Sequence, residues 1–322
     1  MSILITGAAG FIGSHVARAL LSRGEQVLGI DNFSDYYDPA LKRARLDPLC
    51  EHKGFTFVEA DISDRKATLG LAIRYPGIDR IIHLAAQPGV HLSLTDPYVY
   101  VQTNVVGHLV MLELACHLPR LRHFVYASSS SVYGSNRKQP FSVTDRVDHP
   151  ISLYAATKRA DELMTEVYTH LHGLRATGLR YFTVYGPWGR PDMAPYIFAR
   201  AIAAGTVIEL FHRGEVTRDF SYIDDIVAGT IAVLDRPTSE PGHRFYNLAA
   251  ARSENLRVFL GHFEKAFGKA ARIELKPGPP GDMTETSADI TDTVRDFDWH
   301  PKVQVEEGVP NFVEWFKRYH RL

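Results

Sequence analysis

The chain has 322 residues, of which 45% are hydrophobic and 23% are charged, values close to the averages for soluble globular proteins. This composition argues against a disordered, collagen-like or coiled-coil chain, and the length suggests about two domains. The 36 lysines and arginines against 37 aspartates and glutamates leave a net charge of -1, so no basic excess is present to attract nucleic acid.

The cysteine content and the distribution of apolar residues favour a protein of the reducing cytoplasm. Cys50 and Cys116 are far apart in sequence and have no partner at ligand spacing, which argues against a disulfide framework and a zinc site. Residues 1–13 lack the charged and apolar regions of a signal peptide. The uncharged run at 97–112 is interrupted by polar residues and is expected to fall short of a membrane span.

Short β-branched runs alternate with helical patterns over the first half of the chain. Six runs are predicted as strands, at residues 2–6, 26–31, 55–60, 80–85, 122–127 and 176–182. Four segments between them carry apolar residues at helical spacing, at 11–23, 64–74, 96–117 and 153–172. The repeated βαβ pattern predicts a doubly wound, Rossmann-like parallel sheet, in which ligands bind beyond the carboxyl ends of the strands.

The alternation loosens after residue 182, where a second lobe is predicted to begin. Proline and glycine become frequent at 185–195 and 276–282, and the run at 244–249 is expected to return to the main sheet. We therefore expect a Rossmann domain of residues 1–182 plus about 221–250. A smaller substrate-binding lobe is expected from about 183–220 plus 251–322.

The pattern Gly7-x-x-Gly10-x-x-Gly13 follows the first predicted strand and opens the first helix. Glycines allow the backbone to approach a pyrophosphate, and the helix N-terminus offers free N–H groups to that anion. Asp31 ends the second strand, where its carboxylate can bind both adenosine ribose hydroxyls and would repel a 2′-phosphate. NAD is therefore favoured over NADP. A tight turn without a ligand is the alternative, which the combination of strand, helix and Asp31 disfavours.

Tyr154 and Lys158 are four residues apart, on one face of a predicted helix, so both side chains can meet one ligand. A free tyrosine has a pKa near ~10, so a tyrosine that acts as a base needs positive charge nearby. Lys158 and an oxidised nicotinamide ring would supply that charge. The serine run at 128–131 follows the fifth strand, where a hydroxyl could bridge substrate and Tyr154 and relay a proton. Each pattern alone is common on solvated helices or loops, and their joint occurrence predicts a catalytic set.

Together, these motifs resemble the extended short-chain dehydrogenases/reductases that act on nucleotide sugars. The further matching motifs are His83-Leu-Ala-Ala86, Asn104, Val132-Tyr133-Gly134, Arg180-Tyr181-Phe182 and Arg218-Asp219-Phe220. Three segments, 31–38, 186–193 and 281–289, are similar to the UDP-glucuronate 4-epimerases. The resemblance covers almost the whole chain. It implies a tightly held NAD, a UDP-hexuronate substrate, inversion at C4 through a 4-keto intermediate, and a homodimer formed through a four-helix bundle.

The motifs and the resemblance together predict three groups of site residues. The catalytic residues are Ser129, Tyr154 and Lys158. The residues expected to contact the cofactor are Gly7, Gly10, Phe11, Ile12, Gly13, Asp31, Asn32, Asp61, Ile62, Leu84, Ala85, Ala86, Asn104, Tyr154, Lys158 and Tyr181. Substrate is expected to contact Ser130, Ser131, Thr183, Arg190, Arg213 and Arg218. Arg190 presents a planar fork that matches a carboxylate, and Thr183 adds a hydroxyl donor.

Several positions distinguish this chain from relatives with other activities. Dehydratases and decarboxylases of the family carry an acidic residue in the serine motif, where this chain has Ser130 and Ser131. Neutral-hexose epimerases usually have asparagine at the position of Thr183. They also tend to have an arginine where this chain has Pro279-Pro280. Without that arginine, Arg218 with Arg213 would have to neutralise more of the diphosphate charge. The alternatives kept open are a UDP-glucose/UDP-galactose-type or relaxed hexose epimerase, a UDP-glucuronate decarboxylase, and a catalytically silent NAD-binding protein.

Overall fold

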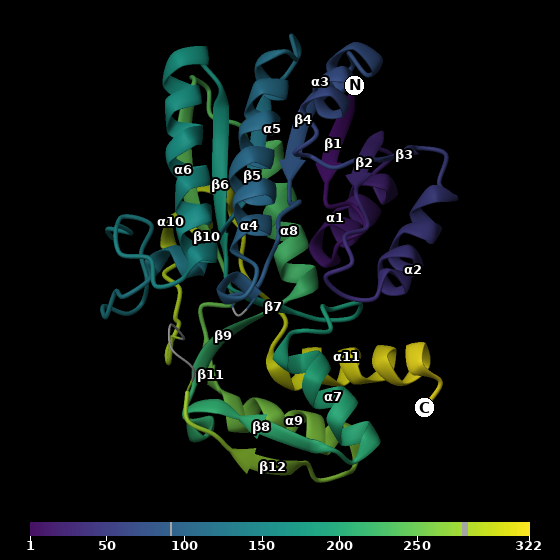
Figure 1. The fold of residues 1–322 in the computed structure, drawn as a ribbon, viewed down its shortest axis with the longest axis vertical. Coiled ribbons are helices and arrows are strands. Elements are labelled where there is room, and N and C mark those ends of the chain that lie inside the picture. The colour runs from purple at the N-terminus through teal and green to yellow at the C-terminus, as the bar shows by residue number, and fades with distance from the viewer. Residues whose placement is uncertain (91, 279–282) are drawn as a thin grey trace.

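A seven-stranded parallel sheet forms the centre of the larger lobe (Figure 1). The structure is a computed structural model that describes residues 1–90, 92–278 and 283–322. The strand order is β10-β6-β5-β4-β1-β2-β3. The strands are β1 (Ser2–Thr6), β2 (Val27–Asp31), β3 (Phe55–Glu59), β4 (Ile78–His83), β5 (His123–Ser129), β6 (Arg175–Tyr181) and β10 (Gly242–Leu248). The doubly wound parallel sheet predicted from the βαβ pattern is thereby confirmed.

Helices cover both faces of this sheet, and strands such as β1 and β2 are therefore buried on both faces. In β1, Ile3 and Ile5 are buried in one apolar cluster and Leu4 in the other, because successive side chains point to opposite faces. The first face is covered by α1 (Phe11–Ser22), α2 (Pro39–Cys50) and α8 (Ile223–Asp235). The second is covered by α3 (Arg65–Arg74), α5 (Gly107–Cys116) and α6 (Leu153–His172).

The six predicted strands and three of the four predicted helices lie within two residues of the observed bounds. Helix α2 was not predicted, although Asp38 caps its N-terminus by accepting a hydrogen bond from the Ala40 N–H and Pro39 occupies its first turn. Pro48 inside the helix and the weak segregation of its apolar residues obscured the helical pattern.

The predicted helix at 96–117 is interrupted by a wider turn. It consists of α4 (Pro97–Tyr100), a π-helical segment η2 (Val101–Val106) and α5. π-Helical turns are often found at functional sites. By length and composition the run Pro97–Cys116 could cross a membrane, with a mean hydropathy of 1.2, so the expectation that it falls short was wrong. Half of that window is buried inside the protein.

The smaller lobe lies below the carboxyl end of the main sheet (Figure 1). It contains a three-stranded sheet in the order β11-β9-β7 and a two-stranded sheet of β12 and β8. Its strands are β7 (Thr183–Tyr185), β8 (Val207–Leu210), β9 (Thr217–Tyr222), β11 (Ser253–Asn255) and β12 (Arg272–Leu275). Its helices are α7 (Ala194–Ala204), α9 (Leu256–Phe267) and α11 (Val305–His320). Strand β10 pairs with β6 as expected, while the division into two domains stays a prediction.

Candidate active site

A cavity of about 790 Å³ opens at the carboxyl ends of the central strands, within the size range of small-molecule sites. Twenty of the predicted site residues line it: Gly7, Gly10, Phe11, Ile12, Gly13, Asp31, Asn32, Asp61, Ile62, Leu84, Ala85, Ala86, Ser129, Ser130, Ser131, Tyr154, Lys158, Tyr181, Thr183 and Arg190. We call this cavity the cleft. A smaller cavity of about 250 Å³ lies at the opposite ends of β5 and β6 and contains none of them.

The glycine-rich turn between β1 and α1 is built for close approach of a ligand. A Cβ atom on Gly13 would lie 2.1 Å from the Gly7 carbonyl oxygen, and Gly7 itself has a φ of +70°. Side chains at these positions would therefore clash with the turn or strain it. Helix α1 begins at Phe11 without a side-chain cap on its N-terminus. Its first N–H groups and its dipole therefore suit the pyrophosphate of a dinucleotide.

Two carboxylates stand at the adenosine end of the cleft. Asp31 accepts hydrogen bonds from the Ala9 N–H at 3.0 Å and the Phe33 N–H at 2.9 Å, and its oxygens retain lone pairs for ribose hydroxyls. Burial would raise the pKa of Asp61, but hydrogen bonds from Ser63 and Asn32 outweigh it and lower that pKa. Both groups fit NAD, and the carboxylate of Asp31 fits a 2′-phosphate poorly.

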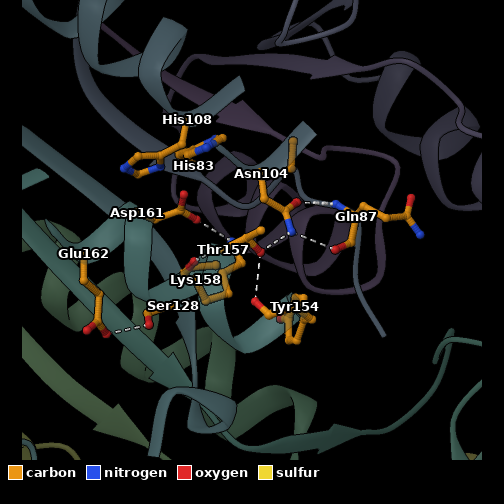
Figure 2. Close-up of polar contacts among 12 residues, drawn as sticks. His83, Gln87, Asn104, His108, Ser128, Tyr154, Thr157, Lys158, Asp161 and Glu162 are labelled. Carbon is orange, nitrogen blue, oxygen red and sulfur yellow. Dashed lines mark hydrogen bonds and ion pairs between the residues drawn. The ribbon is translucent and has the colours of Figure 1, made fainter. Parts of the chain in front are cut away.

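Helix α6 positions the predicted base and the lysine. The Ser152 hydroxyl caps the helix by accepting a hydrogen bond from the Ala155 N–H at 3.1 Å. This cap places Tyr154 in the first turn and Lys158 one turn later, both facing the cleft. The Lys158 ammonium donates to the Ala127 carbonyl at 3.0 Å and to the Asp161 carboxylate at 3.1 Å (Figure 2).

Asp161 is a buried acid that the sequence reasoning missed. It is fully buried, and burial raises its pKa to about 7 although the adjacent Lys158 ammonium opposes this shift. Two buried imidazoles lie nearby (Figure 2). Burial, helped by the charge of Lys158, lowers the pKa of His83 to about 3, so this ring is neutral at physiological pH. The i,i+3 spacing of Lys158 and Asp161 on one helix was the available signal.

Asn104 is not among the residues that line the cleft, and its predicted contact with the cofactor stays a prediction. Its amide donates to the Gln87 carbonyl at 3.1 Å and to the Thr157 hydroxyl at 3.0 Å, and it accepts from the Gln87 N–H at 2.8 Å (Figure 2). The Thr157 hydroxyl donates in turn to the Tyr154 carbonyl at 2.8 Å. The π-helical turn directs Asn104 inward, where it braces the start of α6 and Gln87, which does line the cleft.

The serine run turns sharply at the end of β5. The Ser129 hydroxyl accepts a hydrogen bond from the Ser131 N–H at 3.2 Å and so caps the short 3-10 helix η3 (Ser130–Tyr133). The Ser128 hydroxyl donates to Glu162 at 2.7 Å (Figure 2). Arg180 binds both oxygens of the same carboxylate, at 2.8 and 3.0 Å. This buried network anchors the loop that presents Ser129 to the cleft.

The predicted substrate residues divide into two groups. Thr183 and Arg190 line the cleft, and the Arg190 guanidinium holds the Asp192 carboxylate through Nε and Nη2. Arg213 and Arg218 do not line the cleft. Arg213 is exposed on η4 (Phe211–Gly214), and Arg218 in β9 donates to the backbone carbonyls of Thr217 and Met283. Pro279-Pro280 and Gly281-Asp282 lie outside the described residues.

Comparisons with known proteins agree with this geometry. A profile of the NAD dependent epimerase/dehydratase family matches residues 3–249. UDP-glucuronate 4-epimerase 2 from Arabidopsis thaliana is 43% identical, over 100% of this chain and 77% of its own length. The crystal structure of UDP-glucuronic acid 4-epimerase from Bacillus cereus, in complex with UDP-glucuronic acid and NAD, superposes with a TM-score of 0.93 at 34% identity. That superposition covers 99% of this chain and 100% of the Bacillus chain.

A neutral-sugar enzyme is also structurally similar. UDP-glucose 4-epimerase from Thermotoga maritima, solved with UDP-glucose, has a TM-score of 0.89 at 29% identity and covers 99% of this chain and 100% of its own. The glycine-rich turn and Asp31 fit NAD, and they lie in the same cleft as Ser129, Tyr154 and Lys158. The chain belongs to the NAD-dependent epimerase/dehydratase family.

Proposed function

We propose that the protein is a UDP-glucuronate 4-epimerase, which interconverts UDP-glucuronate and UDP-galacturonate through a 4-keto intermediate. The observation that carries this assignment is the presence of Arg190 and Thr183 in the same cleft as Ser129, Tyr154 and Lys158. The Arg190 guanidinium, which holds Asp192 through Nε and Nη2, brings a positive charge that suits a sugar carboxylate, and Thr183 adds a hydroxyl donor. The other three residues match proton transfer at a sugar hydroxyl.

The reaction assigns a separate task to each residue of the set. Tyr154 takes the proton of the C4 hydroxyl and later returns one, with the Ser129 hydroxyl as a relay. The Lys158 ammonium, held by the Ala127 carbonyl and Asp161, supplies the nearby positive charge. NAD, when bound, supplies the two-electron oxidation and re-reduction of C4.

Arg190 has a role beyond affinity in this proposal. Oxidation of C4 turns the uronic acid into a β-keto acid, which loses carbon dioxide when the bond to the carboxyl carbon aligns with the carbonyl π system. The 4-keto sugar must also turn over so that its opposite face is reduced. We propose that Arg190, assisted by Thr183, restrains the carboxylate in both poses and prevents that alignment.

The same positions disfavour the other activities. Ser130 and Ser131 line the cleft where a dehydratase or decarboxylase would carry an acidic residue, so the chemistry stops at oxidation and reduction of C4. A neutral-hexose epimerase has no use for a guanidinium at the sugar. A silent NAD-binding protein has no use for a tyrosine base.

An assay of the epimerase activity of the purified enzyme with UDP-glucuronate and with UDP-glucose, side by side, identifies the substrate. We expect a preference for UDP-glucuronate. Arg190→Ala should weaken UDP-glucuronate binding by about 2–5 kcal/mol, the usual effect of breaking a buried charge pair, and should raise the fraction of decarboxylated 4-keto pentose. Arg318→Ala, at an exposed arginine of α11 that does not line the cleft, is the matched control. A wild type that prefers UDP-glucose, or an Arg190→Ala enzyme that epimerises UDP-glucuronate normally, would refute the uronate assignment.

We further propose a cytoplasmic homodimer that supplies uronic acids for polysaccharide biosynthesis. Helices α5 and α6 pack against each other and expose apolar side chains on their outer surfaces, namely Leu109, Leu163, Val167 and Leu171. A second copy that covers these side chains through a two-fold axis would form a four-helix bundle with an isologous interface.

A further inference from the structure

Arg45, in the middle of α2, is a fully buried arginine whose side chain reaches Trp188, in the loop between β7 and α7 of the smaller lobe. In the described part of the chain no carboxylate lies within ion-pair distance of it. A guanidinium carries a full positive charge, and burial of an unpaired charge is strongly unfavourable unless its donors are satisfied. The surroundings of Arg45 must therefore compensate in another way.

All five N–H donors of Arg45 are used, and their partners come from three separate segments. Nε and Nη2 both donate to the Trp188 carbonyl, at 3.0 and 2.7 Å, and Nη2 also donates to the Gly189 carbonyl at 3.1 Å. Nη1 donates to the Ala9 carbonyl at 3.3 Å and to the Tyr37 hydroxyl at 2.6 Å. One planar group thus joins the glycine-rich turn to the loop at 186–193.

The loop at 186–193 contains a strained backbone conformation that the hydrogen bonds from Arg45 stabilise. Trp188 has a φ of +65°, in the left-handed region that a bulky side chain rarely adopts. The carbonyl of this residue is the one that receives two hydrogen bonds from Arg45. The fork of Arg45 therefore selects the orientation of the Trp188–Gly189 peptide, immediately before Arg190.

Arg190 is also held from its far side. Its guanidinium donates two hydrogen bonds to Asp192, which accepts a third, at 3.0 Å, from the Tyr36 hydroxyl. Tyr36 and Tyr37 belong to the segment that follows Asp31 on the cofactor side of the cleft. The direction of the Arg190 fork thus depends on the Rossmann lobe, and Arg45 makes the most extensive of these connections.

We propose that Arg45 is a positioning residue for uronate recognition, because its buried fork sets the loop that presents Arg190 against the glycine-rich turn. This inference rests on the proposed function, in which Arg190 binds the carboxylate. It makes a prediction that a general packing role does not make. Loss of the fork should weaken binding of a sugar with a carboxylate more than binding of the same nucleotide sugar without one.

The test compares the dissociation constants of UDP-glucuronate and UDP-glucose by calorimetry on the NAD-loaded enzyme, per bound NAD. Arg45→Lys keeps the charge but loses the planar fork. Because loss of a buried charge contact in a complex usually weakens binding by more than about 10-fold, we expect Arg45→Lys, which disturbs the loop of Arg190, to weaken UDP-glucuronate binding by about 10- to 100-fold. UDP-glucose binding should stay close to that of the wild type. The control is Arg43→Lys, the same substitution at an exposed position of the same helix. It should change neither the dissociation constant of UDP-glucuronate nor that of UDP-glucose.

The outcomes separate the two proposals. A wild type without preference for UDP-glucuronate would refute the proposed function itself. A wild type with that preference, retained in Arg45→Lys, would refute the role of Arg45 and leave the proposed function intact. An equal loss for both nucleotide sugars would also overturn the inference, because it would indicate a general packing role. Arg45→Met removes the charge and the fork together and should lower the preference for UDP-glucuronate over UDP-glucose at least as far. If Arg45→Met does not fold, the result for Arg45→Lys alone decides whether Arg45 positions Arg190.

Discussion

The buried pair of Lys158 and Asp161 predicts an unusual dependence of stability on pH. Asp161 has no exposed surface, and one of its oxygens has no hydrogen-bond partner among the described residues. Burial therefore favours the protonated acid, and the ammonium of Lys158, 3.1 Å away, only partly opposes this. The substitution Asp161→Asn replaces the acid with a neutral group of nearly the same shape.

The size of the effect follows from the shift in pKa. The pKa of Asp161 rises from 3.8 to about 7 on folding, so the folded state holds a proton that the unfolded state has released between these pH values. The free energy of unfolding therefore falls as pH rises through this range, by about 4 kcal/mol in total, at about 1.4 kcal/mol for each pH unit. About 3 kcal/mol of this loss falls between pH 5 and pH 8.

The measurement is urea unfolding of the wild type and Asp161→Asn at pH 5 and at pH 8. The asparagine cannot ionise, so the stability of the variant relative to the wild type should increase by about 3 kcal/mol between the two pH values. Titrating groups that do not contact Asp161 are common to both proteins and cancel in this comparison. Asp47→Asn, whose carboxylate is exposed on α2, is the control and should show no such increase. A relative stability of Asp161→Asn that is equal at pH 5 and pH 8 would refute the reasoning.

Three further predictions concern catalysis, cofactor and assembly. Tyr154→Phe should lower epimerase activity by about 100-fold or more with the urea midpoint unchanged, and Ser129→Ala should lose less, because Ser130 or a water can relay the proton. Near-normal turnover by Tyr154→Phe would exclude it as the base. The protein should purify with NAD, which absorbance after denaturation would detect, and strict dependence on added NADPH would contradict the role given to Asp31. Light scattering should report a dimer at micromolar concentration that Leu163→Glu weakens, and a monomeric wild type would contradict the proposed interface.

Local sequence pattern determined the sheet and the residues along its carboxyl edge. The runs that form β1 and β2 are buried on both faces, so their composition is almost entirely apolar and their bounds are sharp. The glycines between β1 and α1 shape the turn in which they lie, and Ser152 caps α6 through a residue three positions later. Both effects are therefore local in sequence. For this reason the local pattern was sufficient to assign Gly13, Asp31, Tyr154 and Lys158 to one cleft.

Only the tertiary structure decided which polar side chains reach the cleft and which support it from behind. Asn104 has a motif position that predicts ligand contact, and its amide binds Gln87 and Thr157. Arg45 lies on a helix that the sequence pattern did not reveal, and its partners are more than 140 residues away in the case of Trp188 and Gly189. Hydrogen bonds between segments so distant in sequence leave no periodic signal, because the chain's fold, and not its local conformation, brings donor and acceptor together.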